Sequence, residues 1–380
     1  MVKIVHFGKY YFPETGGIES VTASLARGAV KKGHQVSVVC FDKHAGHQTE
    51  TLDGVEVIRV PIGKMVASQP LGSAYFVKCI QRARHADVVH LHAPNMLGAL
   101  ASLFIGKGPR LLVHWHSDVI NKGMLGRLTR PLETALLKRA DAIIATSTVY
   151  AEASETLRPY AKKIQVVPIG VPDVRMTAHP GTGADDSLPP DLRHAIQGKK
   201  LILSVGRLVP YKGFDVLIRA AKYLANDAVM VIVGGGPLKE ELQAAIDAGG
   251  VAGRVILAGR QSDAALHALF SSAQLYCMPS TYRAEAFGVV LLEAMAYGVP
   301  IVATDIPGSA VPWVNAHGVS GVNVPVNDPE ALAHACNDIL ASQEKREVLA
   351  QGARQRFISE FTEEESVRKM LSAYDRLMAN

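Results

Sequence analysis

The stretch PSTYRAEAFGVVLLEAMAYGVPIVAT, residues 279–304, decides the fold of this chain. A turn and a polar loop come before Gly288, and the apolar run after it predicts a helix over 289–296. Gly298 is placed to end that helix, and Pro300 prevents it from continuing. The final Ile-Val-Ala-Thr is typical of a strand, so the stretch is expected to form a loop, a helix and a buried strand.

Two carboxylates stand out in this stretch. Glu285 lies just ahead of the predicted helix and Glu293 lies about one turn inside it, so both can face the same side. Carboxylates accept hydrogen bonds from paired sugar hydroxyls, and the free N–H groups of a helix start bind phosphate. Together these groups suit a nucleotide sugar. The alternative is that Glu285 is a solvated loop residue and Glu293 a surface helix residue.

The same stretch resembles the E-x7-E motif of retaining glycosyltransferases with the GT-B fold. That family includes bacterial mannosyltransferases and sucrose and glycogen synthases. The similarity extends beyond the two glutamates to Gly298, Pro300 and Thr304. The resemblance implies an α/β fold of two Rossmann-like domains facing each other across a cleft, and it implies hexosyltransferase activity.

The resemblance also implies roles for single residues. Glu285 is expected to hold the hydroxyls of the transferred sugar and Glu293 the ribose of the donor nucleotide. The residues between them are expected to line the donor: Ala286, Phe287, Gly288 and Val289.

A second signature follows the predicted strand 201–205 and spans Gly206 to Gly213. Arg207 can grip a phosphate with two hydrogen bonds, Lys212 adds a point charge, and Gly206 lets the backbone approach. Two unrelated surface cations are the alternative. In the family that the chain resembles, both cations hold the donor diphosphate and stabilise it as it leaves. By the same resemblance, the loop with Arg260 and Gln261 is expected beside the base.

The N-terminal segment predicts a strand over 3–7, a loop, a helix that starts near Ile18 and a second strand over 36–41. This is the opening of a doubly wound parallel sheet. The loop is not G-x-G-x-x-G, which disfavours a dinucleotide dehydrogenase. Gly16 and Gly17 allow backbone N–H groups to approach an anion, or they form an ordinary turn. Relatives in the family often carry Gly-Gly-x-Glu here, as this chain does, and both glycines are therefore expected to contact the donor.

Histidines lie near the ends of two predicted strands, His90 and His92 at one and His114 and His116 at the other. Ligands of open α/β sheets bind beyond the carboxyl ends of strands. A metal site is disfavoured because no carboxylate pattern accompanies the histidines. The resemblance places His116 beside the donor sugar, with His114 as the competing assignment. It leaves Asp118 and Tyr11 as acceptor-side candidates.

We expect an acceptor-binding domain over 1–175, a linker over 176–198 and a nucleotide-sugar-binding domain over 199–362. Residues 363–380 are expected to cross back to the first domain. Residues 1–180 hold 22 Lys and Arg against 13 Asp and Glu, and residues 181–380 hold 18 against 22. The basic N-terminal half suits an anionic partner.

Four cysteines without a C-x-x-C pair predict free buried thiols and a reducing, cytoplasmic compartment. The start of the chain does not read as a signal peptide, and no apolar run is long enough to span a membrane. Residues 121–139 form a basic amphipathic stretch. It predicts either peripheral contact with the inner face of the plasma membrane or a helix that packs its leucines on the sheet. No nucleic-acid-binding motif is present.

Finally, the segments 116–118 and 282–288 resemble those of mannosyl- and rhamnosyltransferases of bacterial surface polysaccharides such as lipopolysaccharide. They imply GDP-mannose as donor, a glycan or polyprenyl-diphosphate-linked acceptor, and no cofactor or metal. A UDP- or dTDP-sugar is the alternative donor. A nucleotide-sugar epimerase of the same fold lacks these signatures. A non-catalytic sugar-nucleotide-binding scaffold subunit is the alternative from another class, and intact Glu285, Arg207 and Lys212 argue against it.

Overall fold

The structure is a computed structural model, and it describes residues 1–380 except 15, 44–45, 67–68, 119–122, 178–186 and 380. Of residues 123–128 and 176–177 only the backbone is described. The chain forms two compact units. The first unit comprises Met1–Gly170 and Glu363–Asn380, and the second unit comprises Val171–Thr362. The boundary at Gly170 comes before the predicted one at residue 175.

The first unit contains an eight-stranded sheet in the order β10-β9-β8-β7-β1-β2-β4-β3. Every neighbouring pair is parallel except β3 and β4, which form an antiparallel hairpin at one edge. The order reverses between β1 and β7, which is where open α/β sheets bind ligands. The strands are β1 (Lys3–Phe7), β2 (Gln35–Asp42), β3 (Gln48–Leu52), β4 (Val55–Pro61), β7 (Val88–Ala93), β8 (Arg110–Trp115), β9 (Ala142–Ala145) and β10 (Ile164–Val166).

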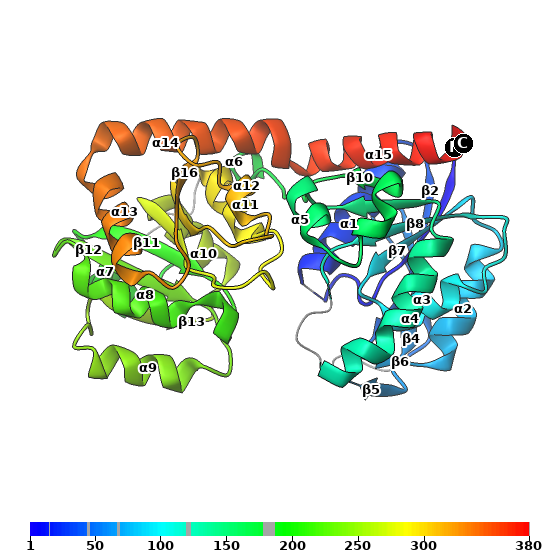
Figure 1. Cartoon of the computed structure of the whole chain (residues 1–380), viewed down its shortest axis with the longest axis horizontal. Coiled ribbons are helices and arrows are strands. Elements are labelled where there is room, and N and C mark those ends of the chain that lie inside the picture. Colours follow the sequence, from blue (N-terminus) through cyan, green and yellow to red (C-terminus); the bar gives the residue numbers. More distant parts are fainter. Residues whose placement is uncertain (15, 44–45, 67–68, 119–122, 178–186, 380) are drawn as a thin grey trace. The chain divides into compact units, whose positions relative to one another are not determined.

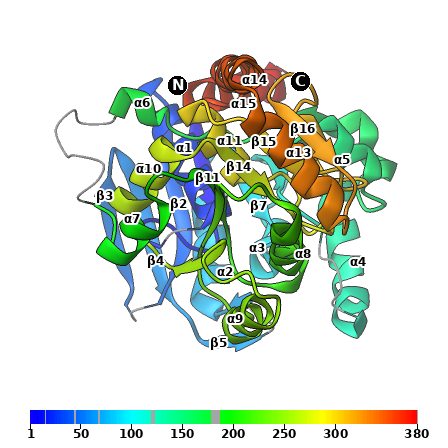
Figure 2. The same cartoon turned by 90° about the vertical axis from the view of Figure 1, so that its left-hand side faces the viewer.

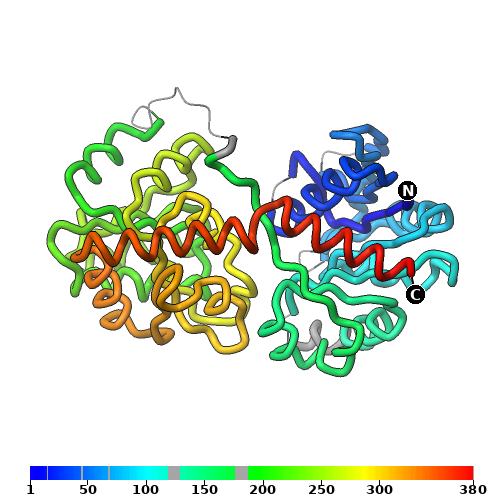
Figure 3. The backbone as a smooth tube through the Cα atoms, turned by 90° about the horizontal axis from the view of Figure 1, so that it is seen from above, coloured from blue at the N-terminus to red at the C-terminus, as the bar shows by residue number. Residues whose placement is uncertain are grey.

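Helices pack on this sheet, and the last one comes from the end of the chain (Figure 1, Figure 3). This helix, α15 (Glu363–Ala379), lies against α1, and Val367 fills the space beside Gly28. The Ser366 hydroxyl donates a hydrogen bond to the backbone oxygen of Pro168 at 2.8 Å. The other helices are α1 (Gly17–Lys31), α2 (Ser73–Ala83), α3 (Met96–Ser102), α4 (Gly123–Arg139), α5 (Thr148–Ala153) and the 3-10 helix η1 (Arg158–Lys163).

The second unit contains a fully parallel six-stranded sheet in the order β13-β12-β11-β14-β15-β16. Counted along the chain this is the order 3-2-1-4-5-6 of a doubly wound Rossmann-like sheet, and it reverses between β11 and β14. The strands are β11 (Lys200–Val205), β12 (Ala228–Val233), β13 (Val255–Gly259), β14 (Leu275–Met278), β15 (Ile301–Thr304) and β16 (Gly321–Val324).

Successive side chains of these strands point to opposite faces of the sheet and pack against different helices. Ile202, Met230 and Cys277 join α8, α9 and α13 in one apolar cluster, while Tyr276 points to the other face and stacks on Phe270 of α10. Figure 2 shows these helices around the sheet. The helices of this unit are α6 (Val174–Thr177), α7 (Pro190–Ile196), η2 (Pro210–Lys212), α8 (Phe214–Ala220), η3 (Ala221–Tyr223), α9 (Lys239–Ala248), α10 (Asp263–Ser272), α11 (Val289–Tyr297), α12 (Val311–Val314), α13 (Pro329–Ala341), α14 (Gln343–Arg356) and the π-helical turn η4 (Phe357–Phe361).

Several boundaries follow from local chemistry that the sequence contains. The Asp328 side chain accepts a hydrogen bond from the backbone N–H of Ala331 at 2.9 Å and so caps the N-terminus of α13. Gly298 adopts a left-handed φ of 69° and ends α11, as predicted.

Other expectations need correction. The predicted linker 176–198 contains the helix α7, and its residues 178–186 lie outside the described part of the chain. The hairpin strands β5 (Lys64–Val66) and β6 (Gln69–Leu71) and the edge strand β3 were not predicted.

The basic amphipathic stretch 121–139 coincides with α4. Leu136 and Leu137 are buried, whereas Arg130 and Lys138 are exposed, so this part of the helix packs its leucines inward. The side chains of residues 121–128 lie outside the described part. None of the described helices combines the length and the apolar character needed to cross a bilayer.

Candidate active site

The candidate site of the second unit lies at the reversal of its sheet. The loops that follow β11 and β14 leave two neighbouring parallel strands at their carboxyl ends. The first loop carries Arg207 and Lys212, and the second carries Ser280 and Glu285. Residues 73 positions apart in the chain therefore come into contact here. This is the place where doubly wound sheets bind nucleotides.

The centre of the site is a buried ion pair. The Lys212 Nζ lies 2.5 Å from the Glu285 Oε2, and each side chain is only 11% exposed. The Ser280 hydroxyl donates a second hydrogen bond to the same carboxylate oxygen at 3.2 Å. The Ser309 hydroxyl and the backbone N–H of Ala310 hold the backbone oxygens of residues 285 and 286. The carboxylate is thus fixed and compensated through Oε2, and no described residue donates a hydrogen bond to its other oxygen.

Arg207 complements this pair because it is exposed at the same loop. Its side chain makes no hydrogen bond or ion pair with another residue of the described part of the chain, so its guanidinium can meet a ligand. Its position depends on a turn of three glycines after β12. Gly234 has a φ of 147°, and a Cβ there would lie 1.9 Å from the backbone oxygen of Gly206. A Cβ on Gly236 would lie 2.4 Å from the backbone oxygen of Leu208. Only glycines let these two loops pack together.

The glycine turn also touches the predicted base-side loop. A Cβ on Gly235 would lie 3.0 Å from Nε of Arg260, which is exposed. The Gln261 side chain donates a hydrogen bond to the backbone oxygen of Ala258. Arg260 is therefore close to the Gly206–Leu208 loop, whereas the Gln261 amide nitrogen is already engaged by the backbone.

The start of α11 offers free backbone donors. Gly288 adopts a left-handed φ of 77° ahead of Val289, and no side chain caps the helix. Phe287, by contrast, is 3% exposed and packs edge-on against Trp313 and Phe361. The side chain of Phe287 thus belongs to the core of the second unit and is not available to line the donor.

Glu293 lies at the middle of α11. Burial raises the pKa of Glu293 to about 7, the negative charge of Asp263 adds to the rise, and the positive charge of Lys212 opposes it. A carboxyl group in this state gains from hydroxyl donors when it ionises. This agrees with contact to a ribose, which remains a prediction.

The first unit holds a cluster of five buried histidines on one face of its sheet. Sequence analysis singled out His90, His92, His114 and His116, and the structure adds His6 from β1, which pairs with His90 across the sheet. Burial lowers the pKa of all five histidines, to about 3 for His6 and His116. The rings are therefore neutral near pH 7. A signal in the sequence was missed, because His6 is the second-last residue of the first strand, next to the reversal of the sheet.

Ring nitrogens in this cluster are close enough to form two triads: His6, His90 and His92, and His92, His114 and His116, with all ligand atoms of a triad within 4.8 Å. His116 is 7% exposed and the other four are at most 1% exposed. His116 is thus the member that reaches the surface, as the sequence interpretation preferred over His114.

The remaining candidates of the first unit differ in accessibility. Gly16 and Gly17 open α1, and a Cβ on Gly17 would meet no atom within 4 Å. Asp118 accepts hydrogen bonds from the Trp115 indole at 2.9 Å and from the Ser154 hydroxyl at 2.8 Å. It therefore has a structural role in addition to the predicted one. Tyr11 is 2% exposed, so its side chain is not presented to an acceptor in this structure.

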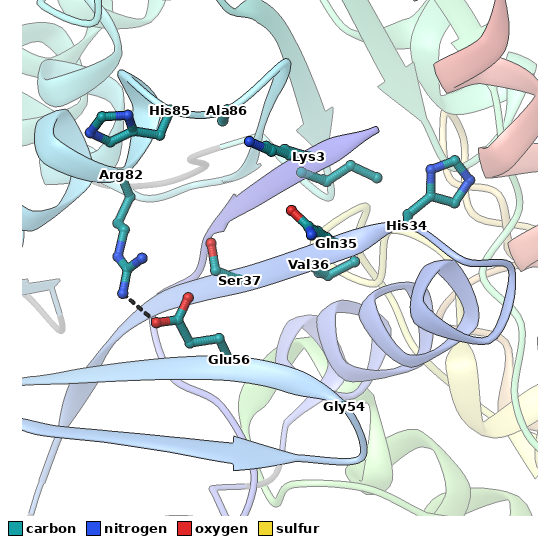
Figure 4. A pocket seen from close by; sticks show the side chains of 11 residues that line it. Lys3, His34, Gln35, Val36, Ser37, Gly54, Glu56, Arg82, His85 and Ala86 are labelled. Carbon is teal, nitrogen blue, oxygen red and sulfur yellow. Dashed lines mark hydrogen bonds and ion pairs between the residues drawn. The ribbon is translucent and has the colours of Figure 1, made fainter. Parts of the chain in front are cut away.

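A pocket at the opposite end of the first unit's sheet is unrelated to these residues (Figure 4). It lies where β1 and β2 begin, at Lys3 and Gln35, and the ion pair of Arg82 and Glu56 lies on its wall. Ligands of parallel sheets bind at the carboxyl ends instead. This pocket is therefore not part of the candidate active site.

Comparison with known proteins gives the family. Residues 193–356 match the model described as glycosyl transferases group 1, and residues 16–170 match the glycosyl transferase 4-like domain. The chain is 30% identical to O-antigen chain mannosyltransferase C of Escherichia coli, over 99% of both chains. It is 31% identical to the D-rhamnosyltransferase WbpZ of Pseudomonas aeruginosa, over 95% of this chain and 92% of that one.

Solved structures share the fold. Sucrose-phosphate synthase from Thermosynechococcus elongatus superposes with a TM-score of 0.79 at 21% identity, over 100% of both chains. HepE of Anabaena in complex with UDP superposes with a TM-score of 0.78 at 22% identity, over 98% of this chain and 100% of that one.

Two Rossmann-like units with these loops define a GT-B glycosyltransferase. The chain belongs to the group 1 glycosyltransferase family, and it is a hexosyltransferase.

Proposed function

We propose that this enzyme transfers mannose, or a closely related hexose, from GDP-mannose with retention of anomeric configuration. The acceptor is a glycan or a polyprenyl-diphosphate-linked glycan in the assembly of a surface polysaccharide. The observation that carries the proposal is the buried Lys212–Glu285 pair beside the exposed Arg207 at the reversal of the sheet. The names of the relatives support the sugar, since they are a mannosyltransferase and a D-rhamnosyltransferase.

The chemistry follows from charge. A nucleoside diphosphate gains negative charge as it leaves, and Arg207, Lys212 and the start of α11 can stabilise that charge in place of a divalent ion. Loss of one such contact typically costs about 3 kcal/mol of transition-state stabilisation. The free oxygen of Glu285 accepts hydrogen bonds from the transferred sugar, and Glu293 accepts them from the ribose.

Retention would follow from attack on the same face of the sugar that the diphosphate leaves. Such a mechanism needs no protein nucleophile, and the carboxylate of Glu285 is unsuited to that role because Lys212 and Ser280 both hold it. The configuration of the product, measured by the anomeric proton coupling of the purified glycan, tests this part. An inverted product would contradict it.

The donor is tested with a thermal-shift panel of GDP-mannose, GDP, UDP-glucose, UDP and dTDP-sugars, each with Mg²⁺ and with a chelator. We expect stabilisation by the guanosine compounds alone, unchanged by the chelator, of about 2.7 kcal/mol at 100 times the dissociation constant. Stabilisation by the uridine or thymidine compounds instead would show that GDP-mannose is not the donor and would identify the nucleotide that is. Stabilisation by none of them would favour the scaffold alternative.

We also propose peripheral contact of the first unit with the inner face of the plasma membrane, where a lipid-linked acceptor would be found. Leu100, Leu103 and Phe104 at the end of α3 are exposed, with Phe104 60% exposed. The neighbouring helix α4 presents Arg130 and Lys138. Exposed apolar side chains beside cations suit an anionic lipid surface.

Co-sedimentation with vesicles that contain anionic lipid tests this contact. Phe104→Ser combined with Leu103→Ser should release most of the protein from vesicles and leave transfer to a water-soluble acceptor unchanged. The matched change Val348→Ser, at a 58% exposed residue of α14 in the second unit, should not affect binding. Equal binding by all variants would reject this surface.

A further inference from the structure

The five histidines of the first unit form two hydrogen-bonded rows. In the first row, Nδ1 of His6 lies 2.9 Å from Nε2 of His92, and Nδ1 of His92 lies 3.0 Å from Nε2 of His116. In the second row, the Tyr374 hydroxyl lies 2.6 Å from Nδ1 of His90, and Nε2 of His90 lies 3.3 Å from Nδ1 of His114. Only the first row includes the histidine that reaches the surface.

Each ring in the first row carries one N–H and one bare nitrogen, because burial keeps the histidines neutral. Two neighbouring nitrogens share one proton in a hydrogen bond. The direction of the bond between His6 and His92 therefore fixes the direction of the bond between His92 and His116. The row has only two tautomeric arrangements, and they differ at every nitrogen.

The inner end of the row selects between them. Nε2 of His6 is buried and has no hydrogen-bond partner among the described residues. In one arrangement this nitrogen would be an unpaired N–H donor, and in the other it is a bare acceptor. Buried donors without a partner are rarer in proteins than buried acceptors that lack one. We therefore expect the bare nitrogen at His6, with N–H donation from His6 to His92 and from His92 to His116.

The outer end then follows by elimination. Nε2 of His116 accepts from His92, so the proton of the neutral His116 ring lies on Nδ1. Nδ1 is also the nitrogen of His116 for which no described residue provides a hydrogen-bond partner, and His116 is the exposed member of the row. The ring thus presents a donor at the carboxyl end of β8.

We propose that His92, with His6 behind it, is a positioning residue that holds His116 in the Nδ1–H tautomer, so that His116 donates a hydrogen bond to a hydroxyl oxygen of the bound sugar. The inference rests on the proposed function for the identity of the ligand. It assigns His116 as a hydrogen-bond donor instead of a base. It also explains why hydrogen-bonded histidines occupy a buried row that apolar side chains could fill.

A metal centre is the competing explanation of the cluster, and the geometry disfavours it. Two imidazole ligands of tetrahedral zinc, each 2.0–2.1 Å from the ion, have nitrogens about 3.3 Å apart. The nitrogens of the first row lie 2.9 and 3.0 Å apart, as in hydrogen bonds. The rings of His92 and His116 are also stacked, with an interplanar angle of 15°.

The proposal is tested by NMR of the full chain with ¹⁵N-labelled histidine, in which ring-nitrogen shifts distinguish a protonated nitrogen from a bare one. We expect His116 to show a protonated Nδ1 and a bare Nε2. In His92→Phe the His116 signals should shift toward the other tautomer, and kcat should fall roughly 10–100-fold with little change in KM, as for other partners that orient a histidine. His92→Gln keeps an N–H donor and should restore both the tautomer and most of kcat.

His90→Phe is the matched control, because His90 lies on the same strand, is equally buried and makes no hydrogen bond to His116. It should leave the His116 tautomer and kcat unchanged while it lowers Tm as much as His92→Phe. A bare Nδ1 on His116 in the unaltered protein, or equal effects of both variants on the tautomer, would overturn the proposal. Stoichiometric Zn²⁺ binding that shifts the signals of the whole cluster would establish the metal centre instead. If His116 showed the expected tautomer but the chain had no transferase activity, the role of His92 in fixing the tautomer would stand and only the proposed function would be rejected.

Discussion

At the scale of single residues, Lys212 and Glu285 illustrate how burial raises the free-energy cost of removing one partner of a charge pair. Each side chain is 11% exposed, and Ser280 gives the carboxylate only one further donor. Removal of one partner from a buried pair leaves the other charge uncompensated, which is far more costly than the net gain from the intact pair.

We expect Lys212→Ala to lower the free energy of unfolding by about 3–5 kcal/mol and kcat by roughly 10²–10³-fold. Thermal unfolding and the transfer rate measure the two effects. Lys222→Ala, at an exposed lysine of η3, is the control and should change neither. A variant that kept the wild-type Tm and kcat would show that the pair serves neither stability nor the leaving diphosphate.

Glu293 provides a prediction about pH. Its pKa is about 7 when folded, against an ordinary value of 4.5. The folded chain therefore binds this proton more readily than the unfolded chain, and the free energy of unfolding falls as pH rises from 4.5 to 7. The full shift corresponds to about 3 kcal/mol.

Glu293→Gln should thus be more stable than the unaltered chain at pH 8, by up to about 3 kcal/mol, and the difference should vanish toward pH 4.5. Urea unfolding at pH 5 and pH 8 measures it. Asp338→Asn, at an exposed residue of α13, should show no such dependence. The Gln variant should also bind nucleotide more weakly, and stronger binding would contradict contact between Glu293 and the ribose.

At the scale of elements, the start of helix α1 allows a structural role of glycine to be distinguished from a role in ligand binding. Gly17 is the first residue of this helix, and a Cβ there would meet no atom within 4 Å. The fold therefore does not require glycine at this position, whereas close approach of an anion to the backbone does.

Gly17→Ala should keep or raise Tm, since alanine favours a helix by about 1 kcal/mol over glycine, and it should weaken donor binding in calorimetry. Gly108→Ala is the control, because Gly108 lies in the same unit and also has open space beside it. If Gly17→Ala bound the donor normally, the predicted donor contact of Gly16 and Gly17 would be wrong.

The same scale shows which elements the sequence predicts well. The buried parallel strands β1, β11 and β15 matched their predicted ranges within a residue, because continuous apolar runs bounded by turns define them. The edge strand β3 was missed, because Gln48–Leu52 is polar and mostly exposed and forms a strand by pairing with β4.

The candidate site was predictable where motifs are local and unpredictable where they are not. Arg207, Lys212 and Glu285 were identified from short motifs, but their meeting depends on β11 and β14 being neighbours. His6 was missed since its partner His92 lies 86 positions away. Phe287 was assigned to the donor because of its place in a motif, whereas its aromatic side chain is buried against Trp313.

At the scale of the whole molecule, the two units should differ in their response to acid. The first unit contains five buried histidines whose pKa values are lowered, so the unfolded chain binds more protons below pH 6.5. Its free energy of unfolding therefore falls as pH drops from 6.5 toward 3. In the second unit, the raised pKa of Glu293 contributes the opposite trend. The lowered pKa values of Asp173 and Asp227, beside Arg354 and Lys200, act in the same direction as the histidines but involve fewer groups.

We expect the first unit to unfold at a higher pH than the second during acid titration. The two tryptophans of the chain report separately, as Trp115 lies in the first unit and Trp313 in the second. Fluorescence of Trp313→Phe follows the first unit, and that of Trp115→Phe follows the second. His6→Phe should move the first transition to lower pH, and His85→Phe, at an exposed histidine, should not. Coincident transitions would contradict the prediction.

The return of Glu363–Ala379 to the first unit has a consequence for biosynthesis. On the ribosome, Met1–Gly170 emerges long before its last helix, because residues 171–362 must be translated in between, which takes on the order of 10–40 s. During that interval the nascent chain lacks Val367 beside Gly28 and the Tyr374 hydroxyl beside His90. The first unit is therefore translated first but completes its fold only after the second unit has been translated. Until then it is the part of the polypeptide that most needs a chaperone.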